Sequence, residues 1–215
     1  MVQYDPVALI LAFGLLALVP TLVAVTTSFL KIAIVMVLVR NALGVQQVPP
    51  NIAMYGLALI LTAYVMAPVG NRMYDAITEQ PHALRSPEAV VKVLRAGAEP
   101  MRDFFQRNAK AEHREFFVRS AQRVWGPELA REVKPADFLV LLPAFVVSEL
   151  TSAFQIGFLL YLPFVVIDLI VSNILLAMGM MMVSPVTISL PLKLFLFVAV
   201  DGWTRMIQGL VLSYA

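Results

Sequence analysis

The chain has 215 residues, of which 60% are hydrophobic and only 14% are charged. Because an ordinary soluble domain carries about 25% charged residues, this composition indicates an integral membrane protein or a membrane-derived assembly. The net charge is only +2, the basic residues are not gathered in one block, and cysteine is absent, which argues against nucleic-acid binding and excludes disulfides and thiolate chemistry.

The first apolar stretch carries no charged residue between Asp5 and Lys31, a gap long enough for a membrane-spanning helix. It lacks the basic start and the small-residue cleavage site of a secretory signal, so we expect an uncleaved first membrane segment. Pro20 should kink this helix. Lys31 lies among apolar residues, where it either extends its ammonium group to an interface or pairs with an acid on another segment.

Turn-forming residues separate this stretch from the next apolar one. Gly44, a glutamine pair at 46–47 and a Pro-Pro pair that begins at Pro49 follow one another closely. The residues after the turn are again uncharged over a membrane length. The sequence therefore predicts a helical hairpin built from 7–39 and 51–69.

Residues 70–137 hold most of the charged residues of the chain, with both signs mixed. Apolar side chains recur with helical periodicity over 87–125, and prolines and glycines such as Pro100 and Gly126 interrupt the pattern. We expect a small water-soluble helical domain, and the plain interpretation gives it no specific activity of its own. Loops of this length cross the membrane whatever basic residues they carry, so charge does not determine on which side of the membrane the polar domain lies. We place this domain on the extracytoplasmic side.

The chain turns apolar again at Phe138. Proline positions predict a helix over 138–160, a break at Pro163, a second helix over 164–182 and a final helix over 190–212. The predicted fold class is all-α, with membrane-type helical hairpins, a polar helical insert and about four or five membrane-length segments. The predicted regions are an N-terminal apolar hairpin (1–69), a polar helical domain (70–137) and C-terminal apolar helices with a methionine-rich loop (138–215).

Charged and polar side chains interrupt the apolar regions, where they are costly and usually face a protein interior, a partner or a water-filled path. Acids and bases balance there, so all of them can pair, within the chain or between copies. Lys193 and Asp201 are roughly aligned on a helix, and Asp201 and Arg205 have the i, i+4 spacing that favours an ion pair. Pairing that fixes helix packing and subunit register is the plain interpretation, and a proton or ion relay is the alternative. The candidate residues are Lys31, Glu149, Gln155, Asp168, Asn173, Lys193, Asp201 and Arg205.

Methionines cluster near the end of the predicted second C-terminal helix, at Met178, Met180, Met181 and Met182. Three consecutive methionines would point in different directions on a helix, and Gly179 and a following Ser-Pro pair break helices, so we expect a loop. Breaks at membrane depth are tolerated where protein buries them or where they line a cavity. Because Met is flexible and polarisable, the cluster either fills a core or forms a deformable ring that seals a conduit.

No catalytic or cofactor-binding motif is present, since the sequence lacks GxSxG, Walker A, HExxH and GxGxxG. Asp168 and Asp201 lie in separate apolar segments, as the two carboxylates of an intramembrane aspartic protease do, but neither has the GxGD pattern. Both histidines, His82 and His113, lie in the polar middle, away from the apolar regions. We therefore expect no enzymatic activity, no cofactor and no metal.

Long stretches outside the polar insert closely resemble the SctR/FliP family of type III secretion export-apparatus proteins, and together they cover most of the remaining chain. These stretches are TSFLKIAIVMVLVRNALGVQQVPPN (27–51), YVMAPVG (64–70), PAFVVSELTSAFQIGF (143–158), LPFVVIDLIVSNILLAMGMMMVSP (162–185) and SLPLKLFLFVAVDGWT (189–204). The VSP ending and the YVMAPVG element are more similar to the virulence (injectisome) branch than to the flagellar branch.

The resemblance implies a non-enzymatic export gate that conducts unfolded secreted proteins across the bacterial inner membrane. Family members form a helical or ring-like pentamer joined by the S and T components, and their partners include further export-apparatus proteins, needle and inner-rod proteins and membrane lipid. The polar domain would then lie on the periplasmic side. The methionine-rich loop of the family corresponds to Met180–Met182 with Met178 beside it, and its copies in the pentamer would form a gasket around the channel.

The alternative function is a proton-coupled polytopic membrane transporter that uses a buried carboxylate. Many such transporters contain inverted or parallel structural repeats, and this sequence has no internal repeat that we can identify. The pattern of residues and the resemblance therefore favour the pore-forming subunit over the transporter.

Overall fold

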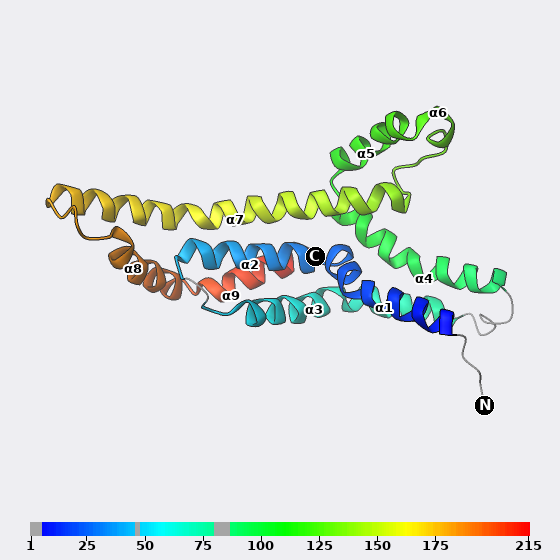
Figure 1. The fold of residues 1–215 in the computed structure, drawn as a ribbon, viewed down its shortest axis with the longest axis horizontal. Helices are drawn as coiled ribbons and strands as arrows, with labels where there is room; N and C mark the ends of the chain where they lie inside the picture. The colour runs from blue at the N-terminus through cyan, green and yellow to red at the C-terminus, as the bar shows by residue number, and fades with distance from the viewer. Residues whose placement is uncertain (1–5, 46–47, 80–86) are drawn as a thin grey trace.

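The computed structural model of the chain describes residues 6–45, 48–79 and 87–215. Every regular element within these ranges is an α-helix, which confirms the predicted all-α fold. The helices are α1 (Pro6–Thr26), α2 (Phe29–Leu43), α3 (Asn51–Thr78), α4 (Pro87–Asn108), α5 (Ala111–Val124), α6 (Gly126–Leu129), α7 (Phe138–Ala177), α8 (Pro185–Ala199) and α9 (Gly202–Leu212). Figure 1 shows α7 running along most of the long axis, with α2 below it in this view and α5 and α6 at one end.

The first apolar stretch forms two helices rather than one. α1 continues through Pro20, and the chain then bends by 69° at Thr27 and Ser28, before α2. The hydroxyl of Thr27 donates to the Val23 carbonyl at 2.6 Å and accepts the N–H of Phe29 at 3.3 Å. The sharp bend thus lies beyond the predicted kink at Pro20, because a threonine side chain supplies hydrogen bonds that replace those of a continuous helix.

The predicted turn between α2 and α3 is confirmed. α2 ends where Gly44 adopts a left-handed φ of 78°, which residues with a Cβ rarely reach. The Arg40 guanidinium donates to the Pro49 carbonyl at 3.2 Å and to the side-chain oxygen of Asn51 at 2.6 Å, and these bonds close the turn. The predicted corner residues 46–47 lie outside the described part of the chain.

The largest departure from the predicted elements is α7, a single helix of 40 residues. It continues through Pro143 and Pro163, so the predicted break at Pro163 is wrong, and it ends at Ala177, before the predicted end at 182. α4 likewise continues through Pro100. A proline removes one backbone hydrogen bond, a local cost that good helix formers on both sides and packing against neighbouring helices can offset.

The predicted final helix, 190–212, is divided in two. α8 begins at Pro185, and α9 follows after a bend of 60°. Asp201 at the bend has a left-handed φ of 54°, and a Cβ added to Gly202 would lie 2.4 Å from the Phe197 ring. Glycine is therefore required where the bend folds back on the preceding helix, a contact that helical periodicity does not reveal.

Two of the described helices, α3 and α7, are long and apolar enough to cross a membrane. The number of spans rises to four if each bent pair, α1 with α2 and α8 with α9, crosses the membrane once. The expectation of a fifth segment is wrong for the described residues, because it divided α7 at Pro163. At 1.5 Å per residue α7 is about 60 Å long, about twice the thickness of the hydrocarbon core of a bilayer. Unless it is strongly tilted, α7 therefore extends well beyond that core.

Buried side chains form two clusters. The first joins α2 to α3, α7, α8 and α9, with Ile32 and Met36 fully buried within it. The second joins Val69 of α3 to α4 and α7, where the ring centroids of Phe104, Phe105 and Phe145 lie 4.9 to 6.2 Å apart. The polar stretch of the sequence is thus packed on the apolar helices through α4.

The isolated chain leaves a large apolar surface uncovered. Its accessible surface is 14538 Å², whereas a compact soluble monomer of 23.7 kDa exposes roughly 9,800 Å². Phe158 and Leu159 of α7 and Phe195 of α8 are 64% to 73% exposed. Side chains of this kind in such number require lipid or other apolar protein surfaces to cover them.

We expect Gly157→Ala to lower the free energy of unfolding by about 1–3 kcal/mol through overpacking between α7 and α2. A Cβ at this position would lie 2.3 Å from a terminal atom of Leu38 and 3.2 Å from its Cβ, so the whole Leu38 side chain must move. Thermal unfolding in detergent measures the change.

The matched control is Gly56→Ala in α3, where no atom lies within 4 Å of the added Cβ. This substitution should be stabilising by about 0.5–1 kcal/mol, because alanine loses less backbone freedom in a helix than glycine does. If both variants shift the unfolding temperature in the same direction, the close packing of Gly157 against Leu38 does not determine the stability of the contact between α7 and α2.

Candidate functional site

The predicted methionine loop is confirmed as a loop that joins α7 to α8. α7 ends because Gly179 adopts a left-handed φ of 73°. The N–H of Met180 bonds the Leu175 carbonyl at 2.9 Å and the N–H of Gly179 bonds the Leu176 carbonyl at 3.0 Å, the pair of bonds that defines a Schellman motif. α8 then starts with Pro185, whose fixed φ suits the first position of a helix.

Three of the four methionines of this loop are largely uncovered by the described part of the chain. Met178, Met181 and Met182 are 66%, 83% and 101% exposed, and Met180 is 39% exposed. The turn between α7 and α8 lies at one extreme end of the molecule, at the left in Figure 1. Core filling within the chain therefore does not account for Met178, Met181 and Met182, and the role of the cluster as a gasket stays a prediction.

The second group of candidate residues surrounds a buried ion pair between α2 and α7. Lys31 Nζ lies 3.3 Å from Glu149 Oε1, and the two side chains are only 5% and 2% exposed. Tyr214, beyond α9, donates a hydrogen bond from its hydroxyl to Glu149 Oε2, and its ring lies 3.6 Å from Lys31 Nζ. Burial, with the charge of Glu149 beside it, raises the pKa of the Tyr214 phenol well above its usual range, so the phenol remains a donor.

Ser148, next to Glu149 in α7, binds the polar region. Its hydroxyl oxygen accepts the N–H of Lys110 at 2.9 Å and lies 2.7 Å from His113 Nδ1, while the hydroxyl donates to the Ala144 carbonyl. One turn of α7 thus holds α2 on one side and the start of α5 on the other. We call Lys31, Ser148, Glu149 and Tyr214 the polar hub.

A second ion pair attaches α8 to α7. Lys193 Nζ lies 2.6 Å from Asp168 Oδ2 and donates to the Ala42 carbonyl at the end of α2 at 3.3 Å. The Lys193 side chain is 8% exposed, whereas that of Asp168 is 41% exposed. The sequence left open whether these residues pair within the chain or between copies. The structure shows pairing within the chain for Lys31 with Glu149 and for Lys193 with Asp168.

The predicted pairing of Asp201 is not observed. Its carboxylate accepts a hydrogen bond from the Thr204 hydroxyl at 2.9 Å, and its carbonyl accepts the N–H of Arg205. No ion pair joins the described side chains of Asp201 and Arg205, and Lys193 pairs with Asp168 instead. The bend between α8 and α9 removes the single helix on which the alignment of Lys193 with Asp201 depended, and Asp201 itself has the left-handed φ of the bend rather than a helical one.

The remaining predicted residues, Gln155 and Asn173, are exposed on α7. Buried positions of α7 such as Glu149, Ala153 and Gly157 recur at every fourth residue, and Gln155 lies off that stripe. The chain does not bury these amides by itself, so their contact with another subunit stays a prediction. Tyr214 and His113 were missed by the sequence analysis, because nothing in their local sequence indicates a distant acid or serine.

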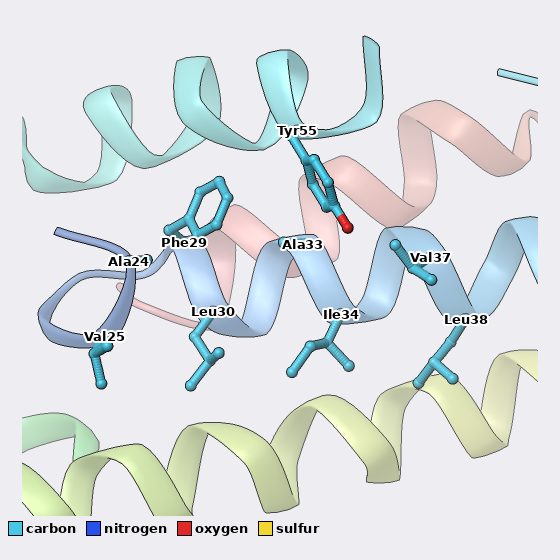
Figure 2. Close-up of a pocket in the computed structure, with 9 residues that line it drawn as sticks. All are labelled: Ala24, Val25, Phe29, Leu30, Ala33, Ile34, Val37, Leu38 and Tyr55. Atoms are coloured by element: carbon cyan, nitrogen blue, oxygen red, sulfur yellow. The ribbon is translucent and has the colours of Figure 1, made fainter. Parts of the chain in front are cut away.

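A groove of about 530 Å³ lies beside α2. Figure 2 shows its lining, with side chains of α2 from Phe29 to Leu38 on one side and Tyr55 reaching in from α3. None of the described residues that line it is charged. The groove is thus part of the uncovered apolar surface rather than a site for polar chemistry.

Comparison with known proteins decides the family. A model of the FliP family matches residues 12–210, which is nearly the whole chain. The chain belongs to the FliP family. The match includes the polar hub apart from Tyr214, both bends and the methionine loop, and it confirms the resemblance of the stretches quoted above.

Curated members of the FliP family are similar over their full length. The chain is 54% identical to Yop proteins translocation protein R of Yersinia pestis over 98% of this chain and 97% of that protein. It is 47% identical to harpin secretion protein HrcR of Erwinia amylovora over 99% of this chain and 98% of that protein. It is 46% identical to virulence protein YscR of Salmonella typhimurium over 98% of each chain.

We expect Glu149→Gln to lower the free energy of unfolding by about 3–5 kcal/mol, because it leaves the buried Lys31 ammonium without a counter-charge. Unfolding in detergent, followed by circular dichroism, measures the loss. The double variant Lys31→Met/Glu149→Leu should recover most of it, since no buried charge then remains.

The control is Glu115→Gln, which removes the acid of the Arg119–Glu115 pair, where both side chains are more than half exposed. It should change the free energy of unfolding by less than about 1 kcal/mol. Equal effects of the two glutamine variants would contradict the buried character of the Lys31–Glu149 pair.

Proposed function

We propose that this chain is a pore-forming subunit of a type III secretion export gate, which conducts unfolded secreted proteins across the bacterial inner membrane. The observation that carries the proposal is the FliP family match over residues 12–210 together with the exposed methionine loop inside it. The relatives named as translocation, secretion and virulence proteins support the virulence branch. The subunit acts by structure alone, without catalysis.

The exposed apolar surface supports assembly into a pentamer with the S and T components. The accessible surface of 14538 Å² is far above that of a compact monomer. Because Lys31 and Glu149 are already paired within the chain, association does not have to bury these two charges and proceeds by covering apolar helix faces. The S and T components, the inner-rod and needle proteins and lipid are the partners that cover them.

The polar region, with α4, α5 and α6, lies on the periplasmic side in this proposal. Ser148 holds the start of α5 against α7 through Lys110 and His113, so the polar region moves with the long helix. The methionine loop lies at the opposite end of α7 (Figure 1). The seal and the polar region are therefore separated by most of the length of α7, about 60 Å.

The methionine loop seals the channel in this proposal. Copies of Met180, Met181 and Met182 from neighbouring subunits meet around the axis and form an apolar constriction, which excludes water and ions by dewetting. Methionine side chains are unbranched and flexible, so they rearrange around a passing polypeptide and close again. Their exposure in the single chain leaves them free to make these contacts.

Replacing Met180, Met181 and Met182 together by alanine should leave assembly intact and make the closed gate leak ions, because shorter side chains leave an open centre. Conductance of the reconstituted assembly and entry of small dyes into expressing cells measure the leak. The same three positions changed to leucine should stay tighter than the alanine variant, since apolar bulk is kept.

Alanine at Val186 and Ile188 of α8, exposed residues just beyond the loop, is the matched control and should not leak. An intact assembly that remains impermeable with three alanines in the loop would count against the gasket.

Purified in mild detergent with its partners, the chain should run as a complex whose mass corresponds to several copies. Native mass spectrometry gives the copy number directly. A monomer that takes up solute in proteoliposomes would contradict the pore subunit and favour a proton-coupled transporter.

A further inference from the structure

Two arginines from neighbouring helices face one hollow on the surface of the polar region. Arg72 of α3 and Arg107 of α4 line a hollow of about 310 Å³, with Asp103 and Gln106 of α4 beside them. Every described residue of this lining is charged or polar. Because one water takes up about 30 Å³ in the liquid, a hollow of this volume has room for a polar group of several atoms.

Local hydrogen bonds orient both guanidinium groups through one nitrogen each. Arg72 Nε donates to the Pro68 carbonyl at 3.3 Å, and Arg107 Nε donates to the Asp103 carbonyl at 3.4 Å. Each arginine keeps the N–H groups of its two terminal nitrogens, a planar fork that suits the oxygens of a phosphate. Neither arginine forms an ion pair with an acidic side chain in the described part of the chain.

Asp103 adds one negative charge to the two positive charges of the hollow. Its i, i+4 spacing to Arg107 favours an ion pair on a helix, yet Arg107 bonds the backbone carbonyl of Asp103, and the described side chains form no ion pair there. The hollow therefore offers donors for a negatively charged group and, beside them, a carboxylate for a positively charged one. A phosphate joined to a primary ammonium group carries both charges.

The hollow lies where α3 leaves its uncharged stretch. Arg72 is the first charged residue after Arg40, and α3 is long and apolar enough to cross a membrane. Ile60 and Tyr64, in the turns before Arg72, are 68% and 72% exposed. Tyrosine is enriched where the hydrocarbon core meets the lipid headgroups, and arginine side chains extend to that interface. A lipid whose headgroup fills the hollow can thus lay its acyl chains along the exposed apolar face of α3.

We propose that Arg72, Arg107 and Asp103 bind the headgroup of a phosphatidylethanolamine-type lipid. The arginines bind the phosphate oxygens, and the Asp103 carboxylate accepts hydrogen bonds from the ammonium group. A choline headgroup keeps the positive charge but has no N–H to donate, and a glycerol headgroup has no positive charge, so both bind less tightly. Lipid binding of this kind is a property of the single chain and does not depend on the proposed secretion function.

Lipid binding to the full-length chain in mild detergent tests the proposal, and native mass spectrometry measures the affinity for the first bound lipid. The probes are phosphatidylethanolamine, phosphatidylcholine and phosphatidylglycerol with identical acyl chains. Phosphatidylethanolamine should bind roughly tenfold more tightly than either of the others, the factor expected from one hydrogen bond to a charged group.

Asp103→Asn should remove most of this preference, because it lowers the affinity for phosphatidylethanolamine and leaves that for phosphatidylcholine unchanged. The double variant Arg72→Gln/Arg107→Gln should lower the affinity for all three lipids roughly tenfold or more, because all three share the phosphate. Arg123→Gln, at an exposed arginine of α5, is the control and should change none of the affinities. Circular dichroism checks that each variant keeps its helices.

Any of four results would overturn the proposal. Equal binding of phosphatidylethanolamine and phosphatidylcholine by the unchanged chain would mean that the ammonium group is not recognised. A preference for phosphatidylglycerol would mean general attraction of an anionic lipid. Unchanged binding by the double arginine variant would place the lipid elsewhere on the chain. Equally tight binding of water-soluble glycerophosphoethanolamine would remove the role of the acyl chains along α3.

Discussion

The buried ion pair of Lys31 and Glu149 fixes the register of α2 against α7, the helix pair around which the rest of the structure packs. A lone charge in an apolar interior is strongly unfavourable, whereas a close pair with further hydrogen bonds is tolerated. The two side chains are 5% and 2% exposed, so α2 and α7 cannot slide past each other without separating the charges. Tyr214 and Ser148 then attach the end of the chain and the polar region to the same turn of α7.

The same pair shapes the surface that remains for assembly. Because Lys31, Glu149, Asp168 and Lys193 find partners within one chain, the faces left open are mainly apolar, and they include the groove beside α2. Association through such faces gains from burial of apolar area, roughly 25 cal/mol per Å². A long helix with an apolar surface, anchored at one turn, suits a subunit that packs side by side with copies or partners.

The two ends of α7 therefore differ in the contacts that they make. Near its start, Ser148 and Glu149 hold the chain together with hydrogen bonds and charge. Beyond its other end, the methionine loop is largely exposed among the described residues, and its sequence is uncharged. The polar residues of this stretch stabilise the subunit, and the apolar tip is left to contact whatever lies beyond the chain. The FliP family match includes this tip, and sealing a channel is the role that we propose for it.

The sequence by itself determined those features that depend on residues close together in the chain. The all-α fold follows from apolar composition and helical periodicity, the turn at Gly44 and the loop at Gly179 from residues that accept a positive φ. Only the tertiary structure decided which acid meets which base, that Pro163 does not break α7, and that Tyr214 belongs to the hub. These outcomes depend on contacts between residues far apart in the chain, whose packing outweighs a local proline or an i, i+4 spacing.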